Sequence, residues 1–151
     1  MKLYRIVKGK HARTAFSGLG ARLAGGRWNF PGETVVYCSC SLALAALETR
    51  VHVEDEGSGL SFVSFEVHVP EHVRIEILER FPKNWRAEPA GETTMRVGSK
   101  WFTAGRTVAL MVPSVLIPSE RNVLLNPAHP EFGGLSISRP TKFTWDPRLW
   151  K

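Results

Sequence analysis

Five polar side chains of this 151-residue chain stand inside or directly beside apolar segments. They are Arg5 in "LYRIV", Arg27 in "GGRWN", Tyr37 in "VVYCS", Glu48 at the end of "LALAALE" and Ser114 after "ALMVP". Arginine presents forked N–H donors to phosphates, and a prepositioned carboxylate stabilises positive charge that develops during a reaction. Each residue also has an ordinary structural explanation, such as a solvated arginine or a serine that begins a turn. The set predicts a binding or catalytic site only if the fold brings its members together.

The segment "GARLAGGRWNF" at residues 20–30 places a cation, a large aromatic ring and an amide directly after two glycines. Glycine lets the backbone approach a ligand closely. The segment therefore indicates either an anion-binding loop or a turn that carries an incidental charge. Trp28 is expected either to contact the ligand or to anchor the loop by packing, and Asn29 belongs to the same segment.

Composition narrows the class of partner without selecting one. The chain has 20 Lys and Arg against 14 Asp and Glu, a formal charge of +6, which favours nucleic acid, a phosphate-bearing small molecule or an acidic protein. Hydrophobic residues make up 43%, typical of a soluble globular protein, and we expect one domain over residues 1–151. The N-terminus lacks the apolar stretch of a secretory signal, and no apolar run is long enough to cross a bilayer, so we expect a cytoplasmic protein without membrane contact.

Metal and disulfide chemistry are not expected. The five histidines lack metal-ligand spacing, and Pro70 between His68 and His72 prevents these two from sharing a helix face. Cys38 and Cys40 are too close in the chain to close a useful loop, so we expect two reduced, partly buried thiols.

The elements that must position the five polar residues are mostly strands, with two helices. The helix at 41–52 is apolar all round in its first half, which predicts burial, and Ser39 or Ser41 is its expected cap. The helix at 93–105 is expected to begin at Thr93 and to stop at Gly105. Strands are predicted at 2–7, 34–39, 61–69, 73–78 and 108–114. Two strand-like pieces are expected within 115–127, and a late strand or hairpin within 135–145. The connections are a glycine-rich segment (8–33), an acidic turn (54–60) and a loop (81–92). These elements predict a single α+β domain.

One combination of motifs is specific. The pattern G-A-x-x-x-G-G-R-W-N at 20–29 is followed by Tyr37 and, eleven residues later, by Glu48. The chain resembles the RES-domain toxins of bacterial type II toxin–antitoxin systems over nearly its whole length. The resemblance also includes "YR" at 4–5, "GSKWF" at 98–102 and the segments 16–29, 35–48 and 112–132. The resemblance implies a fold like that of the ADP-ribosyltransferase toxins, a mixed β-sheet core with inserted helices. It also implies consumption of NAD by hydrolysis, phosphorolysis or ADP-ribosyl transfer, and an antitoxin partner with a helix-turn-helix (Xre-type) domain, with a homodimer inside the complex.

Carried over to this sequence, the resemblance implies an NAD pocket without a metal. Glu48, Arg27 and Tyr37 are its expected catalytic residues, and the expected NAD-binding residues are Arg5, Arg27, Tyr37, Glu48, Ser114, Trp28 and Asn29. The arginines suit the diphosphate, the Tyr37 ring can stack on nicotinamide, and Ser114 can offer its hydroxyl to ribose or amide. Breaking the bond from nicotinamide to ribose is expected to pass through an oxocarbenium-like state. Glu48 is expected to stabilise the developing positive charge, to hold a ribose hydroxyl or to orient the attacking nucleophile.

Two other classes of function stay open. The positive charge allows an RNA-cleaving or RNA-binding toxin, although the sequence lacks the interleaved aromatic and basic residues of a base-stacking platform, so direct nucleic-acid binding is not expected. A non-enzymatic domain that binds a phosphate-bearing ligand is the other alternative. In "NPAHPEF" at 126–132, a structural turn is favoured over a ligand contact by His129.

Overall fold

Eight strands form one sheet in the computed structural model, which describes residues 1–53 and 59–150. The strand order is β4-β5-β6-β2-β1-β3-β7, and β8 also pairs with β3. Only β4 and β5 pair in parallel within the described sheet, so the sheet is mixed, as predicted. The strands are β1 (Lys2–Lys8), β2 (Val36–Ser39), β3 (Phe62–His68), β4 (Ile75–Ile77), β5 (Ala109–Pro113), β6 (Arg121–Leu125), β7 (Ser136–Ile137) and β8 (Thr141–Phe143).

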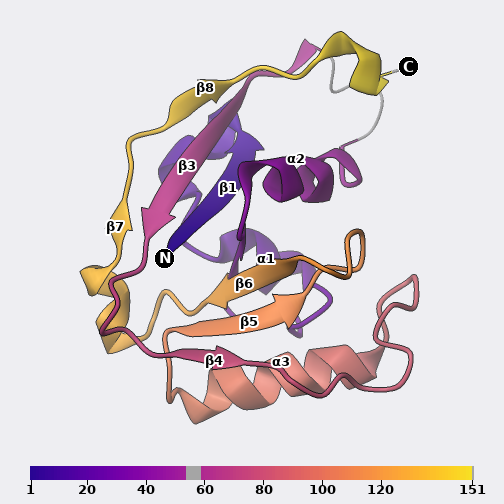
Figure 1. The fold of residues 1–151 in the computed structure, drawn as a ribbon, viewed down its shortest axis with the longest axis vertical. Coiled ribbons are helices and arrows are strands. Elements are labelled where there is room, and N and C mark those ends of the chain that lie inside the picture. The colour runs from indigo at the N-terminus through magenta and orange to yellow at the C-terminus, as the bar shows by residue number, and fades with distance from the viewer. Residues whose placement is uncertain (54–58, 151) are drawn as a thin grey trace.

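The sheet is divided between β1 and β2. These two strands share one register position, Tyr4 opposite Ser39, whereas β1 pairs with β3 along its whole length and β2 pairs with β6 over Val36–Ser39. In Figure 1, β1 and β3 run steeply, while β4, β5 and β6 run nearly horizontally below them. The sheet therefore consists of two halves joined at a narrow seam, and the helix α2 (Leu42–Arg50) lies beside this seam.

One hydrophobic cluster spans both halves of the sheet. Strands on both sides of the seam contribute fully buried side chains, among them Leu3, Val36 and Val123. A second cluster joins the "GGRWN" loop to β5, β6 and the helix α3 (Glu92–Ala104) through Trp28 and Trp101. Each fully buried aliphatic side chain contributes about 1.5–3 kcal/mol.

The helix α3 packs directly onto the backbone of the "GGRWN" loop. A Cβ atom at Gly98 would stand 1.7 Å from the Trp28 carbonyl oxygen, so only glycine permits this approach. The helix begins one residue earlier than predicted, with Gly91 and not Thr93 as its N-cap. It ends at the predicted residue, Gly105, whose φ of 57° is the left-handed conformation that glycine adopts readily.

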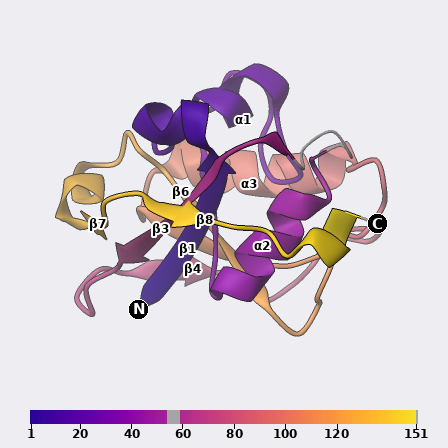
Figure 2. The same ribbon diagram turned by 90° about the horizontal axis from the view of Figure 1, so that it is seen from above.

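The helix α2 is capped by Ser41, whose hydroxyl accepts a hydrogen bond of 3.1 Å from the Leu44 N–H. The prediction that this helix is buried is wrong: only Leu44 and Ala45 are buried, and Leu47 is 41% exposed. The helix lies against the sheet with one face, so its other apolar residues meet solvent. Figure 2 shows the C-terminal turn η4 (Pro147–Trp150) next to α2, where Arg50 Nε donates to the Leu149 carbonyl.

Several connections differ from expectation in detail. The glycine-rich stretch 8–33 contains η1 (Gly9–Thr14) and α1 (Leu19–Ala24), and residues 115–127 supply one strand, β6, instead of two pieces. Strands β7 and β8 both pair with β3 and not with each other; the short helix η3 (Pro130–Gly134) precedes β7. The predicted acidic turn 54–60 falls mainly on residues 54–58, outside the described residues.

Two further expectations concern the thiols and the membrane. Both cysteines are free, with Cys38 buried and Cys40 half-buried, which confirms the prediction of reduced thiols. Among the described residues, no helix has the length and apolar character needed to span a bilayer.

Candidate active site

A cleft of about 500 Å³ opens between the "GGRWN" loop, α2, the loop that precedes α3 and the β5–β6 turn. It adjoins a smaller pocket of about 160 Å³ that reaches the seam between β1 and β2. Tyr37, Glu48, His52 and Asn122 line both spaces. The seam of the sheet therefore forms part of the floor of one continuous hollow.

Glu48 lies one half-turn before the end of α2 and has one oxygen fixed. Its Oε1 accepts hydrogen bonds from Ser114 Oγ at 2.8 Å and from Asn122 Nδ2 at 2.6 Å. Its Oε2 has no hydrogen-bond partner within residues 1–53 and 59–150. Two donors from β6 and the end of β5 thus hold the carboxylate in place, and the second oxygen is left to interact with a ligand in the cleft.

The donors that hold Glu48 are themselves fixed. Asn122 Oδ1 accepts from Ser39 Oγ at 2.7 Å, which sets the amide so that Nδ2 faces Glu48. Ser114 Oγ accepts from the N–H groups of Leu116 and Ile117, each at 3.1 Å. The network makes the carboxylate geometry a property of the folded scaffold, since each group that holds Glu48 is anchored in a strand or a tight turn.

Ser114 differs from its expected role. It was expected to offer its hydroxyl to a ligand, but the side chain is fully buried and lines neither the cleft nor the adjoining pocket. Its hydroxyl instead donates to Glu48 and so holds one carboxylate oxygen.

Arg5 bridges the two halves of the sheet. From β1 its Nη1 donates to the Tyr37 carbonyl of β2 at 2.7 Å, and its Nε donates to the Ala15 carbonyl at 2.7 Å. Burial lowers the pKa of the guanidinium, although arginine is so basic that the group remains charged at neutral pH. Nη2 has no hydrogen-bond partner among the described residues, and Arg5 lines the smaller pocket. The guanidinium therefore combines a structural bridge with a positive charge at the pocket wall.

Tyr37 ties the "GGRWN" loop to β2. Its hydroxyl donates to Asn29 Oδ1 at 2.8 Å and accepts from the Trp28 N–H at 3.1 Å. Burial raises the pKa of this hydroxyl, so it stays protonated and able to donate. A Cβ atom at Gly26 would stand 2.6 Å from the Tyr37 hydroxyl, which explains the second glycine of the loop.

Asn29 and Trp28 support the loop from within. Asn29 is fully buried, and its Nδ2 donates to the Ala21 carbonyl at 3.0 Å and to the Phe30 carbonyl at 2.9 Å. Its amide is therefore occupied by the fold and not free for the ligand contact that was expected. Trp28 is 3% exposed and packs in the cluster with Trp101, which favours the packing-anchor alternative.

Arg27 lines the cleft but is already engaged. Its Nη1 donates to the Trp85 carbonyl at 3.0 Å and to the Ala87 carbonyl at 2.7 Å, and its Nη2 forms an ion pair of 2.9 Å with Glu88. The side chain is 16% exposed, so its charge is only partly screened by water. The guanidinium thus connects the "GGRWN" loop to the loop before α3, and an anionic ligand would compete with Glu88 for it.

Two site residues were not predicted. Asn122 lies in a segment of the family resemblance, but its contact with Glu48 depends on the antiparallel register that sets it opposite Ser39. His52 follows Glu48 by four residues and lines the cleft, the smaller pocket and a third hollow of about 360 Å³ along β1 and η1. The spacing of four residues was the available signal for His52, since in the predicted helix 41–52 it puts both residues on one face.

His129 has a structural role, as favoured from the sequence. Its Nδ1 accepts from the Glu131 N–H at 3.2 Å, capping η3, and its Nε2 lies 3.1 Å from the Gly105 carbonyl. In the part of the chain that the structure describes, no three histidine, cysteine, aspartate or glutamate side chains gather in a way that suits a metal ion.

Comparison with known proteins finds similar sequences. A family model described as "RES domain" matches residues 2–146. A protein of Yersinia enterocolitica named "Toxin Res" is 41% identical over 152 residues, covering 99% of each chain. A protein of a Sphingobium species named "Prs ADP-ribosylating toxin" is 42% identical over 137 residues, covering 88% of this chain and 85% of its own length.

A solved structure has the same fold. It belongs to the Mycobacterium tuberculosis MbcT–MbcA toxin–antitoxin complex, with a TM-score of 0.77 over 99% of this chain and 86% of the other. The sequence identity is 18%, so this likeness concerns the fold alone.

Proposed function

This chain belongs to the RES domain family, and from that premise we propose that it is the toxin of a toxin–antitoxin pair and that it cleaves NAD between nicotinamide and ribose C1′. The observation that carries the proposal is the carboxylate of Glu48, held through one oxygen by Ser114 and Asn122 with the other oxygen unpaired among the described residues.

The chemistry of NAD suits a single fixed carboxylate. Nicotinamide is bound to ribose as a cationic pyridinium and leaves as a neutral molecule, so its departure does not require a general acid. Positive charge then develops at ribose C1′, as in glycoside hydrolysis. A carboxylate oxygen that is prepositioned near C1′ stabilises this charge without having to reorganise during the reaction. Glu48 Oε2 is the group we assign to this role.

The cations and the aromatic ring of the site suit the remainder of NAD. Arg5 and Arg27 place two guanidinium groups on the wall of the hollow, where they would bind the diphosphate. The ring of Tyr37 lines both parts of the hollow and is available for stacking on nicotinamide. We assign Asn29 and Trp28 to support of the loop and Ser114 to orientation of Glu48, and no step of the proposed reaction needs a metal.

The comparisons support an assembly as well as a reaction. The solved structure of the same fold is a complex of a toxin with an antitoxin, and the Sphingobium relative is named "Prs ADP-ribosylating toxin". We propose that a separate helix-turn-helix antitoxin of Xre type neutralises this chain in the cytoplasm, within a complex that contains a toxin homodimer. The ADP-ribosyl group would then pass to water, to phosphate or to a protein.

Product analysis tests this function. Purified protein is incubated with NAD, with and without phosphate, and free nicotinamide, ADP-ribose, ADP-ribose-1″-phosphate and modified protein are measured separately. The variant Glu48→Gln is expected to lose nicotinamide release, while Glu79→Gln, an exposed carboxylate outside the cleft, keeps it. Full activity in folded Glu48→Gln would refute the role of Glu48. Degradation of RNA in a parallel incubation, with NAD intact, would favour the RNA-cleaving alternative.

A further inference from the structure

A row of cationic and aromatic side chains runs from the first residue of β6 to the loop before α3. The Phe81 and Trp85 rings meet at a centroid distance of 5.1 Å. Arg121 lies 5.9 Å above the Phe81 ring, and Arg86 lies 5.9 Å above the Trp85 ring. The order along the surface is cation, ring, ring, cation. We call these four residues the Arg121–Arg86 row.

The Arg121–Arg86 row stands at the rim of the cleft. The loop that carries Phe81 and Trp85 also supplies Glu88, Pro89 and Ala90 to the cleft lining, and the Trp85 carbonyl accepts from Arg27. Arg121 starts β6, opposite Pro113 at the end of β5, and the intervening turn also lines the cleft. In Figure 1 the loop before α3 and the β5–β6 turn both lie at the right-hand side of the lower strands. A macromolecule held on the row would therefore reach the mouth of the cleft.

The residue types of the row are those that dominate protein–protein binding. Phe81 is 38% exposed, and tryptophan and arginine are enriched at binding hot spots. Lys83 and Arg86 are exposed and have no ion pair or hydrogen bond among the described residues. Positive charge around an exposed ring complements a partner surface that is acidic at its edge and apolar at its centre.

The geometry favours a protein over a nucleic acid. Base stacking needs a free aromatic face, but Arg121 covers one face of Phe81, and the two rings are inclined at 52° instead of lying parallel. Trp85 is half-buried and packs against the hydrophobic cluster of α3 and β5. The two rings therefore do not form an open, parallel stacking platform.

We infer that the Arg121–Arg86 row is the docking surface for an acidic protein that receives the ADP-ribosyl group. This inference rests on the proposed function and names its acceptor class. In the transfer, the bond from ribose C1′ to the nicotinamide nitrogen breaks and its electron pair leaves with nicotinamide. A nucleophilic side chain of the docked protein forms the new bond to C1′ and releases its proton to water.

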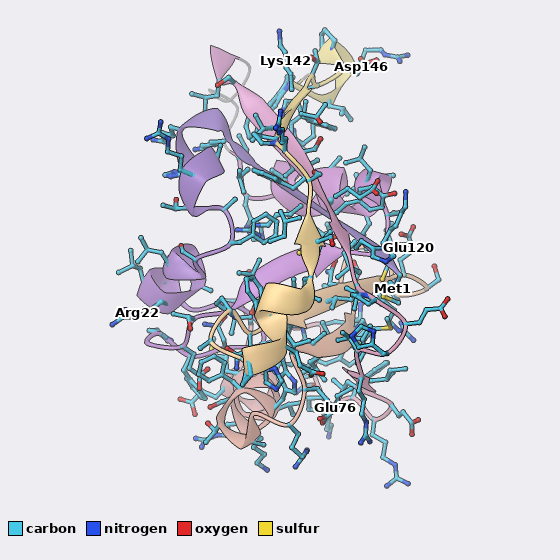
Figure 3. The ribbon with its side chains drawn as sticks, turned by 90° about the vertical axis from the view of Figure 1, so that its left-hand side faces the viewer. Met1, Arg22, Glu76, Glu120, Lys142 and Asp146 are labelled. Atoms are coloured by element: carbon cyan, nitrogen blue, oxygen red, sulfur yellow. The ribbon has the colours of Figure 1, made fainter. Side chains whose placement is uncertain are left out.

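A paired charge-reversal experiment tests the inference. The double variant Lys83→Glu/Arg86→Glu changes the row, and Arg139→Glu/Lys142→Glu applies the same charge change elsewhere. Figure 3 shows Lys142 near the opposite end of the long axis from Glu76 of β4, the strand that leads into the Phe81 loop. Both double variants leave the cleft residues unchanged, so both are expected to release nicotinamide in the absence of acceptor within about twofold of wild type.

Two readouts are taken on the intact protein. The first is transfer of label from NAD to the proteins of a cell extract, expected to fall about tenfold or more in the row variant and to stay unchanged in the control variant. The second is fluorescence anisotropy with a labelled peptide of alternating glutamate and leucine, expected to bind about tenfold more weakly to the row variant. Phe81→Ala is expected to weaken the same peptide without any change in charge.

The outcomes separate the inference from the proposed function. Equal labelling by both double variants, or binding of oligouridine RNA in place of the acidic peptide, overturns the docking surface. Nicotinamide release without labelled protein in the wild type overturns the protein acceptor and leaves NAD cleavage standing. Absence of nicotinamide release refutes the proposed function itself, and with it an inference about its acceptor.

Discussion

Ser114 donates a hydrogen bond of 2.8 Å to Glu48 Oε1 from a position that is fully closed to solvent. The residue that holds the carboxylate is thus shielded from anything that the cleft binds. A group of this kind acts on the reaction only through the carboxylate, which makes its contribution separable from ligand binding.

The variant Ser114→Ala is expected to lower kcat about tenfold and to change KM for NAD less than about twofold, because it loosens Glu48 without removing a contact to substrate. Steady-state nicotinamide release measures both constants. Ser99→Ala is the matched control, since Ser99 also donates to a carboxylate, Glu33 Oε1 at 2.5 Å, but outside the cleft. A rise in KM with kcat intact would place Ser114 against the substrate after all.

Replacement of Gly98 by alanine is expected to destabilise the fold by about 3 kcal/mol or more, because the new methyl group overlaps the Trp28 carbonyl. Gly20→Ala is the control: its Cβ atom meets nothing within 4 Å, and alanine favours the helix there. Urea unfolding of both variants measures the difference. Equal stabilities would mean that α3 does not rest on the "GGRWN" loop.

Tyr37→Phe is expected to reduce the free energy of unfolding by about 1–3 kcal/mol, since Asn29 Oδ1 and the Trp28 N–H both lose their partner. The ring remains, so we expect KM for NAD to change less than about threefold, whereas Tyr37→Leu, which removes the aromatic surface, raises it about tenfold. The two variants thus separate the contribution of the Tyr37 hydroxyl from that of its ring. Similar KM values in both would argue against stacking.

The free energy of unfolding is expected to fall at alkaline pH because of Cys38. Burial raises the pKa of its thiol from 9.0 to about 12, so above about pH 9 the unfolded chain releases a proton that the folded chain keeps. The unfolded state is favoured as pH rises between these values, by up to about 1.4 kcal/mol per pH unit. Urea unfolding from about pH 7 to pH 10 is expected to give a smaller slope in Cys38→Ala. Burial also raises the pKa of Tyr37, which acts in both proteins alike.

Removal of Glu88 is expected to lower KM for NAD about threefold, because the carboxylate no longer competes with the diphosphate for Arg27. Arg27→Ala is expected to raise KM at least about tenfold by loss of the guanidinium itself. Initial rates across a range of NAD concentrations distinguish the two changes. A higher KM in Glu88→Ala would indicate that the ion pair instead holds the cleft in its binding shape.

The sequence motifs named several residues that line the cleft or the smaller pocket but not the hydrogen bonds that connect them. Tyr37 and Glu48 line both the cleft and the smaller pocket, whereas Arg27 lines the cleft and Arg5 the smaller pocket. Asn122 escaped prediction, since a polar residue in a strand has no local signature and its contact depends on β2–β6 register. Which way Ser114 points depends on the turn that follows β5, which residue type alone does not determine.

The local elements of the fold could be predicted from the sequence, but the pairing of distant strands could not. Alternation and turn residues located most strands, and Gly105 marked the end of α3. The burial of α2 was mispredicted because periodicity reports how apolar a helix is, not how much of the sheet it covers, and Leu47 remains exposed. Strands β7 and β8 pair with β3, which is far from them in the chain, so no local sequence pattern predicts this pairing.

The narrow seam between β1 and β2 affects how this protein can change over evolution. The two strands share a single register position, and residues 4–6 and 37–39 along their facing edges line the smaller pocket. Peptide groups are the same for every amino acid, so a molecule that binds them makes contacts that substitution does not readily erase. An inhibitor directed at the seam would accordingly leave fewer routes to resistance than one that relies on side chains alone.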